Sequence, residues 1–194
     1  MEIKDYDEAT VEAVAAHIRK IIELLGEDPT REGLLKTPVR AAKALYYASN
    51  GYRIDPSALM RQAIFEYNGS QMIIVRDIEF YSMCEHHLLP FFGHVSIGYI
   101  PDGTMVGLSK LARIVDAYAR RFQVQERFTT ELCKEVYETL PAKGVMVVCN
   151  AHHMCMKMRG VEKQDATTTT TDYVGVFADD PMLRREFLES IRYR

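Results

Sequence analysis

The order of strand-prone and helix-prone segments constrains the fold of this chain more than any other feature. Two strand-prone stretches, MIIVRDIEFYS and HVSIGYIP, precede two helical patterns, and two more, GVMVVCNAHHMCMKM and ATTTTTDYVGVF, follow them. Their β-branched and aromatic residues suit a pleated sheet. Apolar residues at helical spacing mark the two helices: Leu111, Ile114, Val115, Tyr118, Phe128, Leu132, Val136 and Leu140. This order predicts an α+β core, an antiparallel β-sheet with a pair of helices.

The N-terminal part of the chain predicts two further helices. Apolar residues recur at helical spacing from Val11 to Leu25, and Gly26 follows as a C-cap. Thr37 and Pro38 form an N-cap and N1 pair that opens the second helix. We expect an N-terminal helical arm over residues 1–65 and a catalytic domain over residues 66–194.

Composition argues against several classes of protein. The 194 residues, 47% hydrophobic and 26% charged, are typical of a soluble globular chain. The formal net charge of -3 gives no reason to expect nucleic acid as a partner. No apolar run approaches the roughly 20 residues that span a bilayer, and the acidic start MEIKDYDEAT lacks a secretory signal pattern. We therefore expect a cytoplasmic protein without a membrane partner, in which the four cysteines remain thiols.

The stretch SMCEHHLLP suggests a metal site. Cys84 and His87 stand at a spacing that one turn can fold around a single ion. If the segment HHMCMK continues a strand, His153 and Cys155 point to one face of the sheet and His152 to the other. With Cys155 as the third ligand, the set leaves a fourth position open for water, which is typical of catalytic zinc.

Two more histidines would adjoin this metal. His86 is next to a ligand, and His153 is two residues from another. Imidazole titrates near neutral pH, so both are candidates for proton transfer.

Other interpretations of the cysteines stay open. Two alternatives are that Cys84 and Cys155 are small buried apolar residues or that they form a disulfide, although the spacing favours a metal over burial. Cys133 lies on a helix face and Cys149 between valines, where burial is the stronger interpretation.

Basic residues predict an anion site. In GLSKLARIVDAYARR, Ser109 is a candidate N-cap and Lys110 and Arg113 stand three residues apart, so cations would gather at a helix N-terminus. Arg159 could add a charge. Arg40 and Lys43 repeat the three-residue spacing on the second helix. A solvated basic face explains either pair equally well.

The break QVQERF places a carboxylate at a helix entry. Glu126 could accept hydrogen bonds from a planar ring, or simply favour the helix dipole. From the residues alone, we expect a metal-dependent hydrolase with an anionic, phosphorylated substrate.

Motifs along nearly the whole chain resemble one family. GEDPTREGLLKTPVRAAKAL, SMCEHH, GLSKLARIVDAYARRFQVQER, HHMCMKMRGV and TTTTTDYVGVF look like successive motifs of zinc-dependent GTP cyclohydrolase I. The resemblance implies hydrolytic opening of the imidazole ring of GTP, release of formate and closure to 7,8-dihydroneopterin triphosphate, the first step of tetrahydrofolate or pterin biosynthesis. It also implies the tunnelling fold and a homodecamer of two pentamers with active sites between subunits.

The resemblance assigns roles residue by residue. It makes Cys84, His87 and Cys155 ligands of Zn²⁺, with His86 and His153 as catalytic residues. It implies that substrate is bound by the following residues: Glu126, Gln125, Ser109, Lys110, Arg113, Arg159, Arg40 and Lys43. Two alternatives remain open: another tunnelling-fold enzyme acting on a pterin or deazapurine, and a zinc-stabilised binding module.

Overall fold

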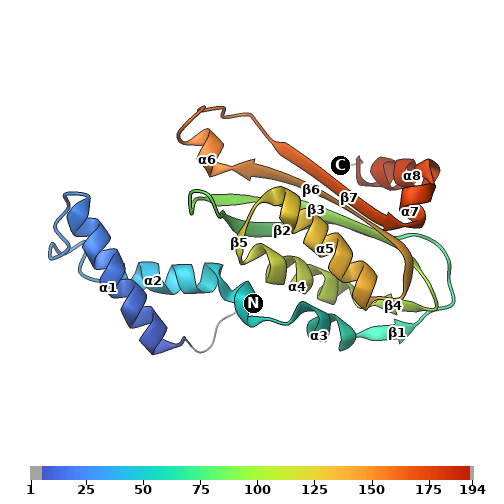
Figure 1. Cartoon of the computed structure of the whole chain (residues 1–194), viewed down its shortest axis with the longest axis horizontal. Coiled ribbons are helices and arrows are strands. Elements are labelled where there is room, and N and C mark those ends of the chain that lie inside the picture. Colours follow the sequence, from blue (N-terminus) through green and yellow to red (C-terminus); the bar gives the residue numbers. More distant parts are fainter. Residues whose placement is uncertain (1–5, 193–194) are drawn as a thin grey trace. The chain divides into compact units, whose positions relative to one another are not determined.

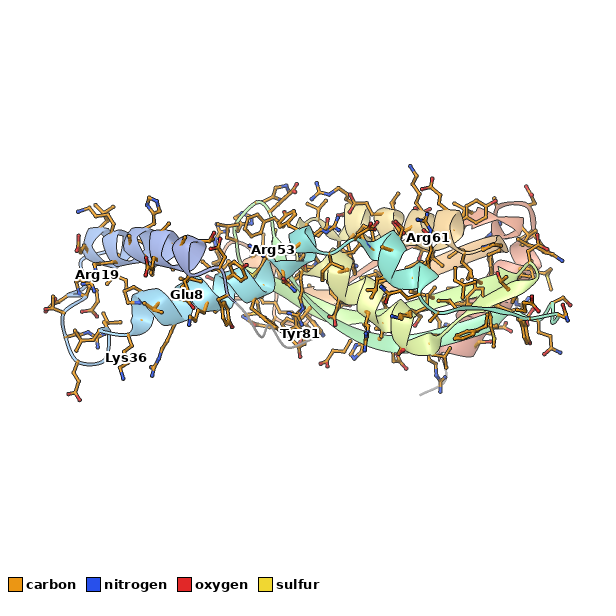
Figure 2. The ribbon with its side chains drawn as sticks, turned by 90° about the horizontal axis from the view of Figure 1, so that it is seen from below. Glu8, Arg19, Lys36, Arg53, Arg61 and Tyr81 are labelled. Carbon is orange, nitrogen blue, oxygen red and sulfur yellow. The ribbon has the colours of Figure 1, made fainter. Side chains whose placement is uncertain are left out.

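The computed structural model describes residues 6–192, and its contacts divide the chain into two compact units, one ending at Asn50 and one beginning at Gly51. In the first unit, α1 (Glu8–Leu24) and α2 (Thr37–Ala48) pack around Val11, Ala15 and Ala42. Exposed side chains such as Arg19 and Lys36 project from this unit (Figure 2). The two predicted N-terminal helices are confirmed, whereas the predicted start of a catalytic domain at residue 66 stays a prediction.

Several short elements begin the second unit. Three of them precede the main sheet: the 3-10 turn η1 (Asn50–Arg53), the helix α3 (Pro56–Arg61) and the strand β1 (Ile64–Glu66). The strand β1 pairs antiparallel with β4 (Thr104–Val106), which lies later in the chain. These elements were not predicted. Each is too short to show a hydrophobic period of its own.

A five-stranded sheet forms the centre of the second unit, in the order β5-β2-β3-β6-β7 (Figure 1). Its strands are β2 (Ile73–Cys84), β3 (Pro90–Pro101), β5 (Phe122–Gln123), β6 (Ala142–His153) and β7 (Thr168–Gly175). All pairs are antiparallel except the short parallel pairing of β5 with β2. The predicted antiparallel sheet is therefore confirmed, including the threonine-rich segment as its last strand.

Helices cover both faces of this sheet. On one face, α4 (Leu108–Ala119) and α5 (Gln125–Thr139) bury their apolar stripes against alternate residues of β6 such as Val145 and Val147. On the other face, Phe177 of α7 (Val176–Asp179) and Phe187 of α8 (Pro181–Arg192) pack against neighbours including Met146. The predicted α+β class and helix pair are confirmed. No helix within residues 6–192 is both long and apolar enough to cross a membrane.

Two local predictions were wrong. β6 ends at His153, and Cys155 lies in the short helix α6 (Met154–Lys157) instead of on the strand. The ladder stops there because His153 pairs with Phe91 beside Pro90, the first residue of β3, and proline has no N–H to extend the pairing. Helix α4 is capped by Gly107, so Ser109 is an exposed residue of its first turn and not the N-cap.

Candidate metal-dependent active site

Three predicted metal ligands converge although they come from distant parts of the chain. Cys84 ends β2, His87 lies in the turn that follows, and Cys155 lies in α6. Their ligand atoms all lie within 4.8 Å of one another. Cys84 is buried, Cys155 is half-buried and His87 is exposed, so the cluster opens to solvent on the side of the imidazole.

A tight turn brings His87 back toward Cys84. We call residues 84–88 the ligand turn. The amide of Leu88 donates to the carbonyl of Cys84 at 2.8 Å, and the amide of Cys84 donates to the carbonyl of Leu89 at 2.9 Å. Leu88 adopts a left-handed conformation with φ 53°, which is uncommon for a residue with a side chain. This reversal leaves Cys84 Sγ 4.0 Å from His87 Nδ1.

The donor set fits a zinc ion. Two thiolates and one imidazole are common ligands of tetrahedral Zn²⁺, and three protein ligands leave one position for chemistry. Burial first, and then the adjacent Cys84 sulfur, raise the pKa of the Cys155 thiol. A cation bound between the two sulfurs would oppose both effects and favour the thiolates. All four cysteines are free thiols in the structure.

His153 is held firmly beside the three ligands. Its ring stacks on Phe91 with centroids 4.7 Å apart and an interplanar angle of 1°. Its Nε2 lies 2.8 Å from Oε1 of Gln125. Burial lowers the pKa of His153, and the nearby Glu126 carboxylate partly opposes that effect. His153 therefore favours the neutral ring, the form that can accept a proton.

Gln125 determines which nitrogen of His153 carries the proton. The Gln125 side chain is 1% exposed, and its Nε2 donates to the carbonyls of Cys149 and Thr168 at 3.1 and 2.9 Å. The amide nitrogen is thus committed as a donor, so Oε1 must accept, and Nε2 of His153 must donate to it. In the neutral ring, Nδ1 of His153 is then the basic nitrogen.

These groups surround one small cavity of about 210 Å³. It is lined by the three ligands and by His86, Val124, Gln125, Glu126, His153, Met156 and Thr168. Glu126 is exposed in the first turn of α5, as predicted for a carboxylate at a helix entry. Val124, Met156 and Thr168 were not predicted, because their sequence carries no chemical signal.

The predicted anion-binding residues are not gathered at this cavity. Ser109, Lys110 and Arg113 of α4 are absent from its lining, and Lys110 Nζ donates to Gln62 Oε1 at 2.9 Å. Arg159 is exposed and close enough to Cys155 to oppose weakly the effect of burial on its pKa.

Arg40 and Lys43 belong to the other compact unit. Both lie on α2, where Lys43 Nζ is 3.7 Å from a carboxylate oxygen of Glu8. Their contribution to a substrate site stays a prediction.

A larger cavity of about 550 Å³ lies over different residues. Its lining includes Glu79, Tyr81, His94 and His152, and none of the three metal ligands. His152 thus faces away from His153, as the alternation along β6 predicts. Size alone would favour this second cavity as the candidate active site, but the concentration of thiol, imidazole and carboxylate groups favours the smaller cavity.

Comparison with known proteins identifies the family. The sequence profile described as GTP cyclohydrolase I matches residues 14–192. The chain belongs to the GTP cyclohydrolase I family. A GTP cyclohydrolase 1 of Porphyromonas gingivalis is 55% identical over 178 residues, covering 92% of each chain. A GTP cyclohydrolase 1 of Bacteroides fragilis is 50% identical over 194 residues, covering 100% of each.

Among solved structures, the apo form of the archaeosine synthase QueF-Like aligns with a TM-score of 0.45 and 17% sequence identity. The alignment covers 56% of this chain and 97% of that one. This likeness is too remote to carry an argument. Membership of the GTP cyclohydrolase I family rests on the sequence relatives, and the cavity described above is where its chemistry is expected.

Proposed function

We propose that the protein catalyses the GTP cyclohydrolase I reaction with Zn²⁺ held by Cys84, His87 and Cys155. The reaction opens the imidazole ring of GTP by hydrolysis, releases formate, rearranges the ribose and closes the ring of 7,8-dihydroneopterin triphosphate. The observation that carries the proposal is the meeting of the three ligands with His86, His153 and Glu126 around one cavity, in a member of this family.

The metal and two histidines would divide the chemistry of ring opening. When bound, Zn²⁺ supplies Lewis-acid chemistry and lowers the pKa of water at the site to about 7. His86 lines the cavity with an exposed imidazole, so it can donate a proton to the purine ring. His153, with Nδ1 as its basic nitrogen, can move protons at the ribose during rearrangement.

Glu126 would select guanine. A carboxylate only accepts hydrogen bonds, and guanine presents two adjacent donors, N1–H and the exocyclic amine. Adenine offers no N1–H, so its binding would leave one carboxylate oxygen without a partner. The side chain of Gln125 is already bonded to His153 and to two carbonyls. Gln125 would therefore support the contact with guanine indirectly, without its side chain binding the base.

The triphosphate would be bound by basic residues from more than one chain. The residues proposed for it are Lys110, Arg113, Arg159, Arg40 and Lys43, and Ser109 is proposed for the ribose side. Ser109, Lys110 and Arg113 do not line the cavity of their own chain, which supports a site completed by a neighbouring subunit. Within residues 6–192, β7 pairs only with β6, and β5 covers only the last two residues of β2, so each chain offers strand edges for association. We infer a tunnelling-fold homodecamer of two pentamers.

We propose the cytoplasm as the place of the reaction. A reducing cytoplasm would keep the four free cysteines available for metal or burial. The product would enter tetrahydrofolate or pterin biosynthesis at its first step.

The test is to incubate zinc-loaded protein with GTP and to follow formate together with the absorbance and fluorescence of a pterin. A sample stripped by a chelator serves as the control. Formate and pterin appearing together, and only with metal, is the expected result. Formate alone would contradict the ribose-side role of His153. The absence of both products, from an assembled protein shown to hold zinc, would refute the proposed function.

A further inference from the structure

Arg127 joins three parts of the chain with one side chain. Its Nη2 forms an ion pair with Oε2 of Glu85 at 2.5 Å and donates to the carbonyl of Phe122 at 2.9 Å. Its Nε donates to Oε1 of Gln123 at 3.1 Å. The guanidinium thus connects the ligand turn, β5 and the first turn of α5.

The partner on β5 is itself immobilised. Gln123 is 1% exposed, and its Nε2 donates to the carbonyl of Tyr118 and to Glu131 at 3.2 and 3.0 Å. Its Oε1 is therefore a fixed acceptor for Arg127. This network distinguishes Arg127 from an ordinary exposed helix ion pair such as Lys134 with Glu138, which contributes little.

The ligand turn has few other means of support. The side chains of residues 85–88 are all exposed, so no buried apolar group anchors the turn after Cys84. Outside its own hydrogen bonds, its main chain is attached to β5 by the amide of Glu85, which donates to the carbonyl of Gln123 at 3.0 Å. The ion pair between Glu85 and Arg127 attaches the same residue a second time, through its side chain.

The two ends joined by Arg127 carry the two halves of the site. The ligand turn holds Cys84, His86 and His87, whereas the first turn of α5 holds Gln125 and Glu126. The second oxygen of the Glu85 carboxylate, Oε1, lies 3.9 Å from Nε2 of His86. A shift of Glu85 would therefore move His87, a proposed ligand, and His86, the proposed proton donor, relative to Glu126, the carboxylate proposed to bind guanine.

We propose that Arg127 and Glu85 are positioning residues that hold the metal-binding turn in register with the first turn of α5. Neither residue touches the metal or the substrate in this role. The inference rests on the proposed function, because it assumes that Cys84, His87 and Cys155 bind a metal.

The experiment titrates Co²⁺ into chelator-stripped protein and records the d–d absorption bands, whose positions report ligand geometry. Arg127→Met, Glu85→Gln and the double variant are compared with the wild type and with Lys134→Met, a control on an exposed ion pair of the same helix. Formate release from GTP is measured on the zinc-loaded forms, and urea unfolding shows that each variant is folded.

The expected result is that each single variant binds Co²⁺ about tenfold more weakly and shows shifted bands, since supporting residues of metal sites have effects of this size. The double variant should be no worse than the poorer single variant, because both changes break one interaction. The loss of activity should appear mainly in kcat.

Two results would overturn the proposal. One is that both single variants match Lys134→Met in Co²⁺ affinity and spectrum. The other is that their effects multiply in the double variant, which would show that the two residues act separately. Failure of the proposed function is distinguishable, because the wild type itself would then bind no Co²⁺ or release no formate.

Discussion

At the scale of single residues, two adjacent histidines illustrate how position gives identical side chains different surroundings. His153 pairs with Phe91 in the ladder, stacks on its ring and lines the small cavity beside Cys155. His152 faces the other side of the sheet, where its ring packs against Phe92. The difference comes entirely from the period of two along β6.

Exchange of each histidine for asparagine should separate these environments. His153→Asn removes the proposed general acid and base, so kcat should fall by roughly 10²–10⁴-fold. His152→Asn should leave kcat close to the wild-type value. Initial rates of formate release at saturating GTP measure both. A collapse of activity in His152→Asn would show that the strand register near the site differs in the working enzyme.

The cysteines should differ in their reactivity toward iodoacetamide. Burial raises the pKa of the Cys133 and Cys149 thiols to about 12, so neither should react until the protein unfolds. Cys155 is half-buried and should become reactive when a chelator removes the metal, with Cys84 following more slowly. Peptide mass spectrometry of chelated and zinc-loaded samples measures this. Equal labelling of Cys155 in both samples would argue against Cys155 as a ligand.

At the scale of elements, the long segments were predictable and the short ones were not. The hydrophobic periods of α1, α2, α4 and α5 and the strand-prone segments of β2, β3, β6 and β7 were visible in the sequence. Helix α6 was not, because its four residues continue a strand-like pattern and its start depends on where β3 begins.

The candidate site shows the same division. The spacing singled out Cys84 and His87, and the residues alone also drew attention to Glu126 and the basic pairs. The family resemblance gave Glu126 and the basic residues their proposed roles in binding substrate. The Glu85–Arg127 ion pair joins residues 42 apart and follows no spacing rule, so only the structure reveals it. The strand argument placed Cys155 near Cys84 and His87, which the structure shows, but Cys155 lies in a short helix and not on the strand.

Helix α8 should support stability without supporting chemistry. Phe187 is fully buried on the sheet face opposite α4 and α5, and Phe187→Ala should lower the free energy of unfolding by roughly 3–5 kcal/mol. Urea unfolding measures that loss. The kcat/KM of the folded variant should stay close to the wild-type value, because α8 does not line the small cavity. A selective loss of kcat in a variant shown to be folded would refute this separation.

At the scale of the whole molecule, two of the residues proposed to bind the triphosphate lie apart from the proposed metal site. The proposed metal ligands and Glu126 line one cavity. Lys110 and Arg113 are on α4 and do not line it. In the proposed homodecamer, a neighbouring chain would bring its basic residues to the triphosphate. Activity should therefore depend on assembly.

Mixed oligomers test this dependence directly. Cys84→Ala removes a proposed metal ligand and Lys110→Met removes a proposed phosphate contact, so each variant alone should be nearly inactive. In co-expressed mixed oligomers, roughly a quarter of the sites should combine an intact half from each chain and regain activity. Tandem affinity tags isolate the mixed species for assay. Persistent inactivity of verified mixed oligomers would place both halves within one chain.

The separation of the ligands along the chain has a consequence for biosynthesis. Cys84 and Cys155 are carried by β2 and by the segment after β6, with β3 lying between these strands in the sheet. A growing chain on the ribosome contains only two of the three proposed ligands until most of it has been made. Because chains fold progressively from the N-terminus during synthesis, metal acquisition should be a late event that marks completion of the sheet.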